Sequence, residues 1–192
     1  ISIYLIGDIM SVQEEFGGNL TNEEFKKFTL YMNQSNNFED DNTRAIILGF
    51  HKEKIRVAPG AIVRINENQI GENSYIGLYS YINGDVNIGK NVLIGPHVSI
   101  VASNHVFNPH TESFSNRSDL QKGKVIINDG AWLTSGVVVT PGITIGKCAL
   151  VCANSVVTQS VNDYAIVAGT PAKQIGEIEP RTGVYHWFGK ED

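Results

Sequence analysis

Residues 70–100 read IGENSYIGLYSYINGDVNIGKNVLIGPHVSI, and an isoleucine stands at every sixth position of this stretch. Four places after each of the first five isoleucines comes a small or β-branched residue, as at Ser74, Ser80 and Val86. That residue and the next isoleucine are two apart, so both side chains point to one face of an extended chain. The Gly and Asn residues between them tolerate the backbone of tight turns. Each hexad therefore predicts a short strand and a corner.

The same period returns after an interruption, with aliphatic residues six apart at Ile127, Leu133, Val139, Ile145, Val151 and Val157. One hexad cannot bury its apolar face alone, so the units must stack, and a hexad repeat is typical of a parallel β-helix. A helix would need apolar residues three and four apart, which this pattern lacks. We therefore expect an all-β fold, a hexapeptide-repeat solenoid. An antiparallel β-sandwich is the alternative.

Composition narrows the functional class. The net charge of −5 and the absence of Lys/Arg runs argue against a nucleic-acid-binding protein. No stretch is long and apolar enough to predict a membrane span. Cys148 and Cys152 stand at non-equivalent positions of successive hexads, which favours free thiols in a reducing cytoplasm. No second Cys/His pair has ligand spacing, so no metal site is expected.

The first 56 residues lie outside the repeat and predict a small α/β extension. Thr21 and Glu24 have the spacing of a capping box, and apolar residues follow at helical spacing at Phe25, Phe28 and Met32. We expect a helix over residues 21–33.

Three further segments of the extension carry weaker patterns. Residues 1–10 predict a short strand. The polar and acidic stretch over residues 33–41 predicts a loop. Residues 44–50 are rich in aliphatic side chains and predict a second strand.

The solenoid is expected over residues 57–176, followed by an aromatic tail over residues 177–192. Its repeat breaks over residues 102–124, a polar stretch with aromatic residues and two histidines. A solenoid admits a long insertion only at a corner, and long loops in compact domains are usually functional or disordered. Phe107 and Phe114 favour a loop that packs on its own coil or on a neighbouring subunit.

Residues 127–146 read INDGAWLTSGVVVTPGITIG. Together with the hexads, this run resembles the hexapeptide-repeat acyltransferases, in the branch of the galactoside and maltose O-acetyltransferases. The resemblance covers about residues 57–176. It implies a left-handed parallel β-helix, acetyl-CoA as acyl donor, and a homotrimer with active sites between subunits. The implied activity is transfer of an acetyl group to a hydroxyl of a carbohydrate, such as a surface polysaccharide or its precursor.

The resemblance implies that His105, at the start of the insertion, is the general base. An alcohol is a poor nucleophile until its proton is removed, and a histidine near neutral pKa does this for about 10²–10⁴ in rate. A loop histidine without a role is the alternative interpretation, and His110 is the second candidate.

The same resemblance implies the donor-binding residues. The amide of Ser135 would face the thioester carbonyl, where such a donor is worth about 10²–10³ in rate. Trp132 would lie near the pantetheine arm, or else be an exposed ring packing between coils. The backbone of Ala153 would bind the pantetheine, and Thr158 and Lys173 the adenine and phosphate end.

Two positions depart from the branch, because Gln159 and Gly176 stand where basic residues are usual. Both changes remove positive charge from the expected phosphate site. Asn83 and Asp85, upstream of the insertion, match the region where the family places groups facing an acceptor sugar. A plain polar corner is the alternative for these two residues.

Other functions remain open for this fold. An N-acetyltransferase of a nucleotide amino sugar would use the same donor. A zinc-dependent hydratase of the γ-carbonic-anhydrase type needs a third histidine upstream of the pair at positions 105 and 110, and the corresponding position holds Gln69. A non-catalytic trimeric scaffold would bind no CoA.

Overall fold

The structure is a computed structural model that describes residues 20–35, 37–115 and 120–189. The chain divides into two compact units, residues 1–36 and 37–192. Each unit is described by itself below.

The first unit contains helix α2, Asn22–Gln34. The Thr21 hydroxyl accepts from the Glu24 amide at 3.3 Å, and the Glu24 carboxylate accepts from the Thr21 amide at 2.8 Å. This reciprocal cap begins the helix, and the helix expected over residues 21–33 is present. The strand expected over residues 1–10 lies outside the described residues.

The second unit begins with helix α3, Phe38–Ile47. The loop expected over residues 33–41 and the strand expected over residues 44–50 are therefore wrong. The Asn37 side chain caps the helix by accepting from the Asp40 amide at 2.9 Å, and the acidic first turn suits the positive end of the helix dipole. These local signals override the strand propensity of the aliphatic residues that follow.

Helix α3 is joined to the first coil of the solenoid by side chains that bind backbone carbonyls. Asn42 donates to the carbonyl of Ile55 at 2.8 Å, and Arg44 donates to the carbonyl of Val57. Arg44 also pairs with the buried Asp41 carboxylate at 2.7 Å. The helix thereby covers the N-terminal end of the core.

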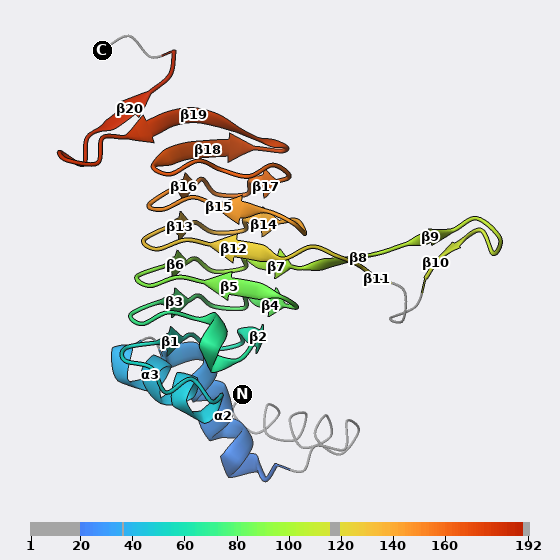
Figure 1. Cartoon of the computed structure of the whole chain (residues 1–192). Coiled ribbons are helices and arrows are strands. Elements are labelled where there is room, and N and C mark those ends of the chain that lie inside the picture. Colours follow the sequence, from blue (N-terminus) through green and yellow to red (C-terminus); the bar gives the residue numbers. More distant parts are fainter. Residues whose placement is uncertain (1–19, 36, 116–119, 190–192) are drawn as a thin grey trace, which may run out of the picture. The chain divides into compact units, whose positions relative to one another are not determined.

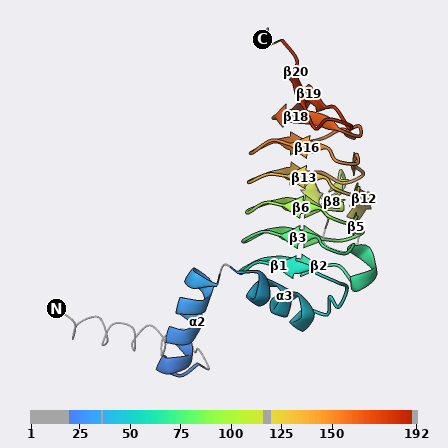
Figure 2. The same cartoon turned by 90° about the vertical axis from the view of Figure 1, so that its left-hand side faces the viewer.

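Three sheets form the sides of a parallel β-solenoid of about six turns (Figures 1 and 2). Sheet A contains β1 Arg56–Val57, β3 Tyr75–Ile76, β6 Leu93–Ile94, β13 Trp132–Leu133, β16 Leu150–Val151, β18 Ala165–Gly169, β19 Ala172–Ile178 and β20 Tyr185–Trp187. Sheet B contains β2 Ile62–Arg64, β4 Tyr81–Asn83, β7 Ser99–Val101, β14 Val138–Val139 and β17 Val156–Val157. Sheet C contains β5 Val86–Ile88, β12 Val125–Ile127 and β15 Thr144–Ile145, and a 3₁₀ turn, η1, spans Glu67–Gln69.

The aliphatic residue of each hexad points into the core. Ile76, Ile82 and Ile94 are at most 1% exposed. Successive coils pair in parallel, for example Ile76 with Ile94, so the predicted solenoid is confirmed and the antiparallel sandwich is wrong. The small residues inside are satisfied as well, because the buried Ser74 hydroxyl donates to the carbonyl of Gly89 at 2.8 Å.

Each coil turns at three corners. The first corner leads from sheet A to sheet B, the second from sheet B to sheet C, and the third back to sheet A. Backbone hydrogen bonds stack the first corners, since the amide of Gly136 donates to Pro96 and the amide of Asn154 donates to Ser135, each at 2.9 Å. Positive φ angles at these turns explain why Gly and Asn recur in the hexads.

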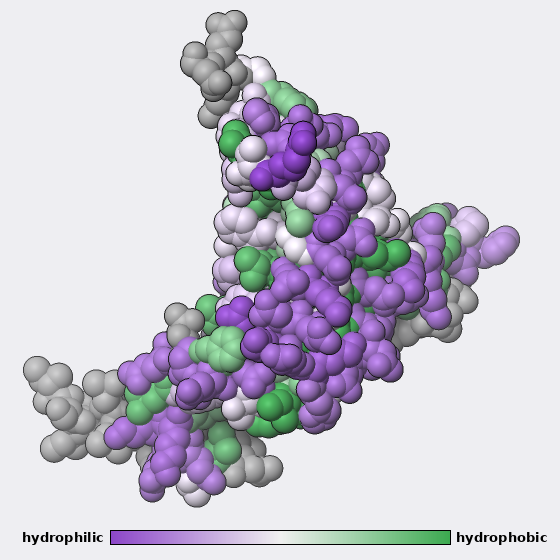
Figure 3. Space-filling view, turned by 60° about the vertical axis from the view of Figure 1, so that its left-hand side comes forward, coloured by the Kyte–Doolittle hydropathy of each residue, from purple (hydrophilic) through white to green (hydrophobic). Residues whose placement is uncertain are grey.

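The insertion leaves the solenoid at the second corner as a protruding arm, which the structure describes over residues 103–115 and 120–122 (Figure 1). Its base pairs β8 Ser103–His105 with β11 Leu120–Lys122, and its outer part pairs β9 Phe107–Asn108 with β10 Ser113–Phe114. A hydrogen bond of 2.9 Å from the amide of Gly123 to the carbonyl of Ala102 closes the neck. Figure 3 shows apolar side chains on the arm within a mostly hydrophilic surface.

No helix in the described part of the chain is long and apolar enough to cross a membrane.

Candidate active site

Asn83 and Asp85 lie directly beside the neck of the arm, one coil earlier. The carbonyl of Asn83 accepts from the amide of Ala102 at 3.1 Å, and the carbonyl of Asp85 accepts from Val125 at 2.9 Å. The Asp85 carboxylate is exposed and lies 3.8 Å from the amine of Lys124. The second corner therefore gathers polar groups where the arm leaves the solenoid.

His105 ends β8 on the arm, and its side chain is exposed. Its Nδ1 atom lies 2.7 Å from the carbonyl oxygen of Ser115. A carbonyl oxygen can only accept, so Nδ1 carries the proton and Nε2 of the neutral ring keeps its lone pair. This tautomer is the one a general base needs. His110 lies in the turn at the tip, where its amide donates to the Asn108 side chain at 2.9 Å.

Ser135 lies at the first corner, at the opposite end of the sheet B strands, and Trp132 precedes it in β13 of sheet A. The Trp132 ring is 45% exposed and stands between Leu93 and Leu150 of the neighbouring strands. Ser135 is exposed, and its carbonyl accepts from Asn154 at 2.9 Å. Its amide donates to no acceptor within the described residues. The N–H of Ser135 is thus available to a ligand.

Ala153 occupies the same place in the next coil. Trp132 pairs with Leu150, and each of the two corner residues comes three positions later. The amide of Ala153 likewise has no acceptor in the part of the chain that the structure describes. The coil below has Pro96 at this place, so proline is compatible with the turn.

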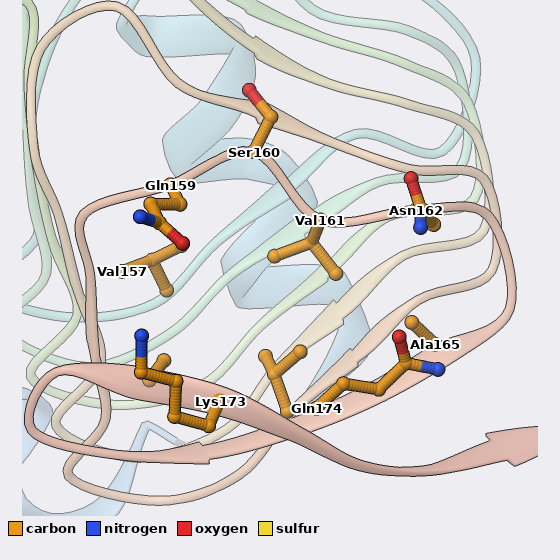
Figure 4. A pocket seen from close by; sticks show the side chains of 10 residues that line it. Val157, Gln159, Ser160, Val161, Asn162, Ala165, Lys173 and Gln174 are labelled. Atoms are coloured by element: carbon orange, nitrogen blue, oxygen red, sulfur yellow. The ribbon is translucent and has the colours of Figure 1, made fainter.

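Lys173 lines a pocket of about 150 Å³ at the C-terminal end of the solenoid (Figure 4). Val157 and Val161 contribute apolar surface, and Gln159 and Gln174 contribute amides. The Lys173 amine points toward Gln159 (Figure 4). Lys173 is the one Lys or Arg among the pocket-lining residues described. Thr158 lies between two lining residues and is exposed.

The structure explains the glycine at position 176. Gly176 in β19 pairs with Trp187 in β20, and the carbonyl oxygen of His186 occupies the place where a Cβ on residue 176 would lie. Any side chain there would displace β20. The pairing of β19 with β20 therefore excludes a basic residue at this position.

One chain divides the predicted residues between two corners. His105, Asn83 and Asp85 lie at the second corner, whereas Ser135 lies at the first corner and Trp132 in the strand that leads to it. One side of the solenoid takes six residues, a span of at most about 20 Å. Sequence analysis did not find the carbonyl of Ser115, because a backbone acceptor has no side-chain signature.

The described residues contain no group of three His, Cys, Asp or Glu side chains with the geometry to hold a metal ion. Cys148 and Cys152 are free thiols.

Known proteins resemble this chain in sequence and structure. The family model for the bacterial transferase hexapeptide (six repeats) matches residues 69–102. A galactoside O-acetyltransferase from Escherichia coli K12 is 32% identical over 120 residues, which cover 62% of this chain and 58% of that protein. A putative acetyltransferase from Dictyostelium discoideum is 33% identical over 152 residues, 77% of this chain and 78% of that protein.

The fold gives the same result. A hexapeptide-repeat acetyltransferase from Vibrio cholerae O1 biovar eltor, solved with acetyl coenzyme A, has a TM-score of 0.56 and 26% identity, over 80% of this chain and 85% of that one. The chain spans 58% and 51% of the length of two curated galactoside O-acetyltransferases that it matches. The chain belongs to the hexapeptide-repeat acetyltransferases.

Proposed function

We propose that this chain is an acetyl-CoA-dependent O-acetyltransferase that transfers an acetyl group directly to a hydroxyl of a carbohydrate, with His105 as general base. The observation that carries the proposal is the contact of 2.7 Å between His105 Nδ1 and the Ser115 carbonyl. With Nδ1 as the donor, the neutral ring has its lone pair on Nε2, on an exposed part of the arm. Galactoside O-acetylation is the activity named for the Escherichia coli relative.

In this mechanism, Nε2 of His105 takes the proton of the acceptor hydroxyl while the hydroxyl oxygen attacks the thioester carbonyl carbon. A C–O bond forms, the C–S bond breaks, and the CoA thiolate leaves with the electron pair. The imidazolium then gives its proton to the thiolate. The hydrogen bond to Ser115 stabilises the imidazolium, because Nδ1 stays a donor throughout.

The free amide of Ser135 supports the other half of the mechanism. Negative charge develops on the carbonyl oxygen as the hydroxyl attacks, and an N–H without a protein acceptor can donate to it. The free amide of Ala153, one coil further, would bind the pantetheine, and the Trp132 ring would cover the pantetheine as well. Thr158 and Lys173 would hold the adenine and phosphate end, with Lys173 supplying the cation.

We infer that the active site forms between copies of the chain, in a homotrimer. His105 and Ser135 lie at different corners, and acyl transfer requires the base and the oxyanion donor at one carbonyl. A neighbouring copy related by a cyclic axis would bring a first corner next to a second corner. Asn83 and Asp85 would then face the acceptor beside the neck of the arm.

The test combines binding and turnover on the full chain. Calorimetry measures acetyl-CoA binding, and thiol release is followed with a panel of hydroxyl and amino sugars for wild type, His105→Ala and His110→Ala. We expect His105→Ala to bind acetyl-CoA as wild type does and to lose about 10²-fold or more in kcat. His110→Ala is the matched control on the same arm, and it should keep its activity.

Three outcomes contradict the proposal. A wild type that binds no acetyl-CoA would be a scaffold. Equal activity of His105→Ala and wild type would remove the general base. Faster turnover of amino sugars than of hydroxyl sugars would make the chain an N-acetyltransferase.

A further inference from the structure

An exposed aromatic pair lies on the arm close to His105. Phe107 and Phe114 are opposite each other in β9 and β10, and their rings meet edge to face with centroids 5.6 Å apart. The two residues are 51% and 70% exposed. Exposed apolar surface of this kind on a protruding element marks a contact site.

The pair and His105 share one face of the arm. Two hydrogen bonds keep the chain extended between them, from the Val106 amide to the Ser115 hydroxyl at 3.0 Å and from the Ser115 amide to the Val106 carbonyl at 2.7 Å. Side chains two apart in a strand point to the same side, roughly 7 Å from each other. Phe114 shares that face because it is directly opposite Phe107. Val106 points to the other face.

The part of the arm that carries the two rings suits an uncharged ligand. Residues 103–115 read SNHVFNPHTESFS, in which Glu112 is the single Asp, Glu, Lys or Arg, whereas the other charged residues of the insertion, such as Arg117, Asp119 and Lys122, come later in the sequence. Aromatic rings with a few amides and hydroxyls bind ligands that have both an apolar face and hydrogen-bonding groups. A pyranose ring has this character, with C–H groups on its faces and hydroxyls around its rim. A phosphate would instead need cations.

We propose that Phe107 and Phe114 form an acceptor platform that determines acceptor specificity, a role that rests on the proposed function. The C–H face of an uncharged sugar ring packs on the two rings, and its reacting hydroxyl then meets Nε2 of His105. His105 and Phe107 are two residues apart in an extended chain, so the base and the platform can contact the same sugar. The platform binds the acceptor and takes no part in proton transfer.

The experiment compares Phe107→Ala and Phe114→Ala with wild type, using methyl and phenyl β-galactopyranoside as acceptors and thiol release from acetyl-CoA as the signal. We expect each variant to raise the acceptor KM about 5- to 10-fold, the range for loss of an aromatic contact. The KM for acetyl-CoA and the pH profile of kcat should stay those of wild type. Phe114→Tyr keeps the ring and should keep the acceptor KM.

Two variants provide matched controls. Val106→Ala removes a 43% exposed apolar side chain from the opposite face of the same arm, and Phe188→Ala removes a 54% exposed phenylalanine far along the chain. Neither should change the acceptor KM. Light scattering on every variant reports the oligomeric state.

The proposal is overturned if the acceptor KM stays unchanged in both phenylalanine variants, or rises equally in Val106→Ala. It is also overturned if kcat falls and its pH profile moves, because the pair then positions His105. A loss of subunit association would show that the rings pack on a second copy. Failure of the proposed function is read separately, from wild type that turns over neither acceptor nor any other sugar.

Discussion

Gly95 lies against the peptide bond that leads into Ser135 in the next coil, and a Cβ added to Gly95 would be 3.0 Å from the amide nitrogen of Ser135. The same Cβ would be 2.9 Å from the backbone carbon of Thr134. These are backbone atoms, which cannot move aside as a flexible side chain does. The absence of a side chain at Gly95 therefore determines the position of the Ser135 amide, which we propose donates to the oxyanion.

Gly95→Ala is expected to displace the Ser135 amide and lower kcat about tenfold or more, since small misplacements in an active site are costly. Overpacking should also destabilise the fold by about 1–3 kcal/mol. Gly71→Ala is the control, because it creates a backbone clash of the same kind at the third corner, against Gly89. It should lower the melting temperature with a smaller effect on kcat. Equal kcat losses in the two variants would contradict a specific role for Gly95.

Ser135→Pro tests the amide directly. Pro96 occupies the equivalent place in the coil below, so the turn accepts proline while the substitution removes the N–H. We expect kcat to fall about 10²–10³-fold, the usual effect of losing one oxyanion donor. Ser135→Ala keeps the amide and should retain nearly full activity.

Leu78→Pro makes the same replacement at the equivalent place two coils below Ser135 and should leave kcat unchanged. Steady-state kinetics and circular dichroism on all three variants check the prediction. An active Ser135→Pro variant would refute the oxyanion assignment.

Gln159→Lys and Gly176→Arg both restore a charge that the branch usually carries, and the structure predicts opposite results. Residue 159 lines the pocket beside Lys173, so a second cation should tighten binding of CoA relative to dephospho-CoA, measured by calorimetry at low salt. Gly176→Arg should gain no affinity and should lower the melting temperature, because the carbonyl of His186 takes the space. A well-folded Gly176→Arg protein with tighter CoA binding would contradict this account.

Burial raises the pKa of the Asp41 carboxyl above its ordinary value, opposed by the hydrogen bond from Arg44. A carboxyl that binds its proton more tightly in the folded state stabilises the fold while it is protonated. This contribution to the free energy of unfolding is lost as the pH rises from the ordinary pKa of about 3.9 through the raised pKa. Asp41→Asn removes this titration. Urea unfolding at pH 4 and pH 7 should show the stability of the variant, relative to wild type, increasing with pH.

Glu39→Gln, in the first turn of the same helix, controls for the loss of an acidic residue from α3. Its stability relative to wild type should change less between the two pH values. A difference for Asp41→Asn that is constant from pH 4 to pH 7 would be evidence against a raised pKa.

The repeat predicted the solenoid because each hexad specifies a strand and a corner locally, and equivalent hexads can bury their apolar side chains only by stacking. Ile70 to Ile100 needed no tertiary information to be assigned to the core. Helix α3 was missed because the Asn37 cap, which fixes its start, outweighs the strand propensity of the aliphatic residues from Ala45 onward. Bonds from Asn42 and Arg44 to the first coil add to these local signals, and a local pattern does not contain them.

The site residues remain predictions. The family resemblance implied the role of His105, whereas its tautomer depends on the carbonyl of Ser115. The sequence also gave no reason for Gly176, whose cause is the pairing of β19 with β20. Every residue type has a backbone carbonyl and almost any can pair in a strand, so neither feature can be recognised from the sequence.

The neck of the arm has a consequence for how such enzymes diversify. Val125 pairs with Val86 as if the insertion did not interrupt the coil, and one bond between Ala102 and Gly123 closes the gap. The hydrophobic core is therefore insulated from whatever the arm contains. Substitutions and insertions in the arm can therefore change its length, aromatic content and charge, and with them the acceptor, while the solenoid keeps its stability.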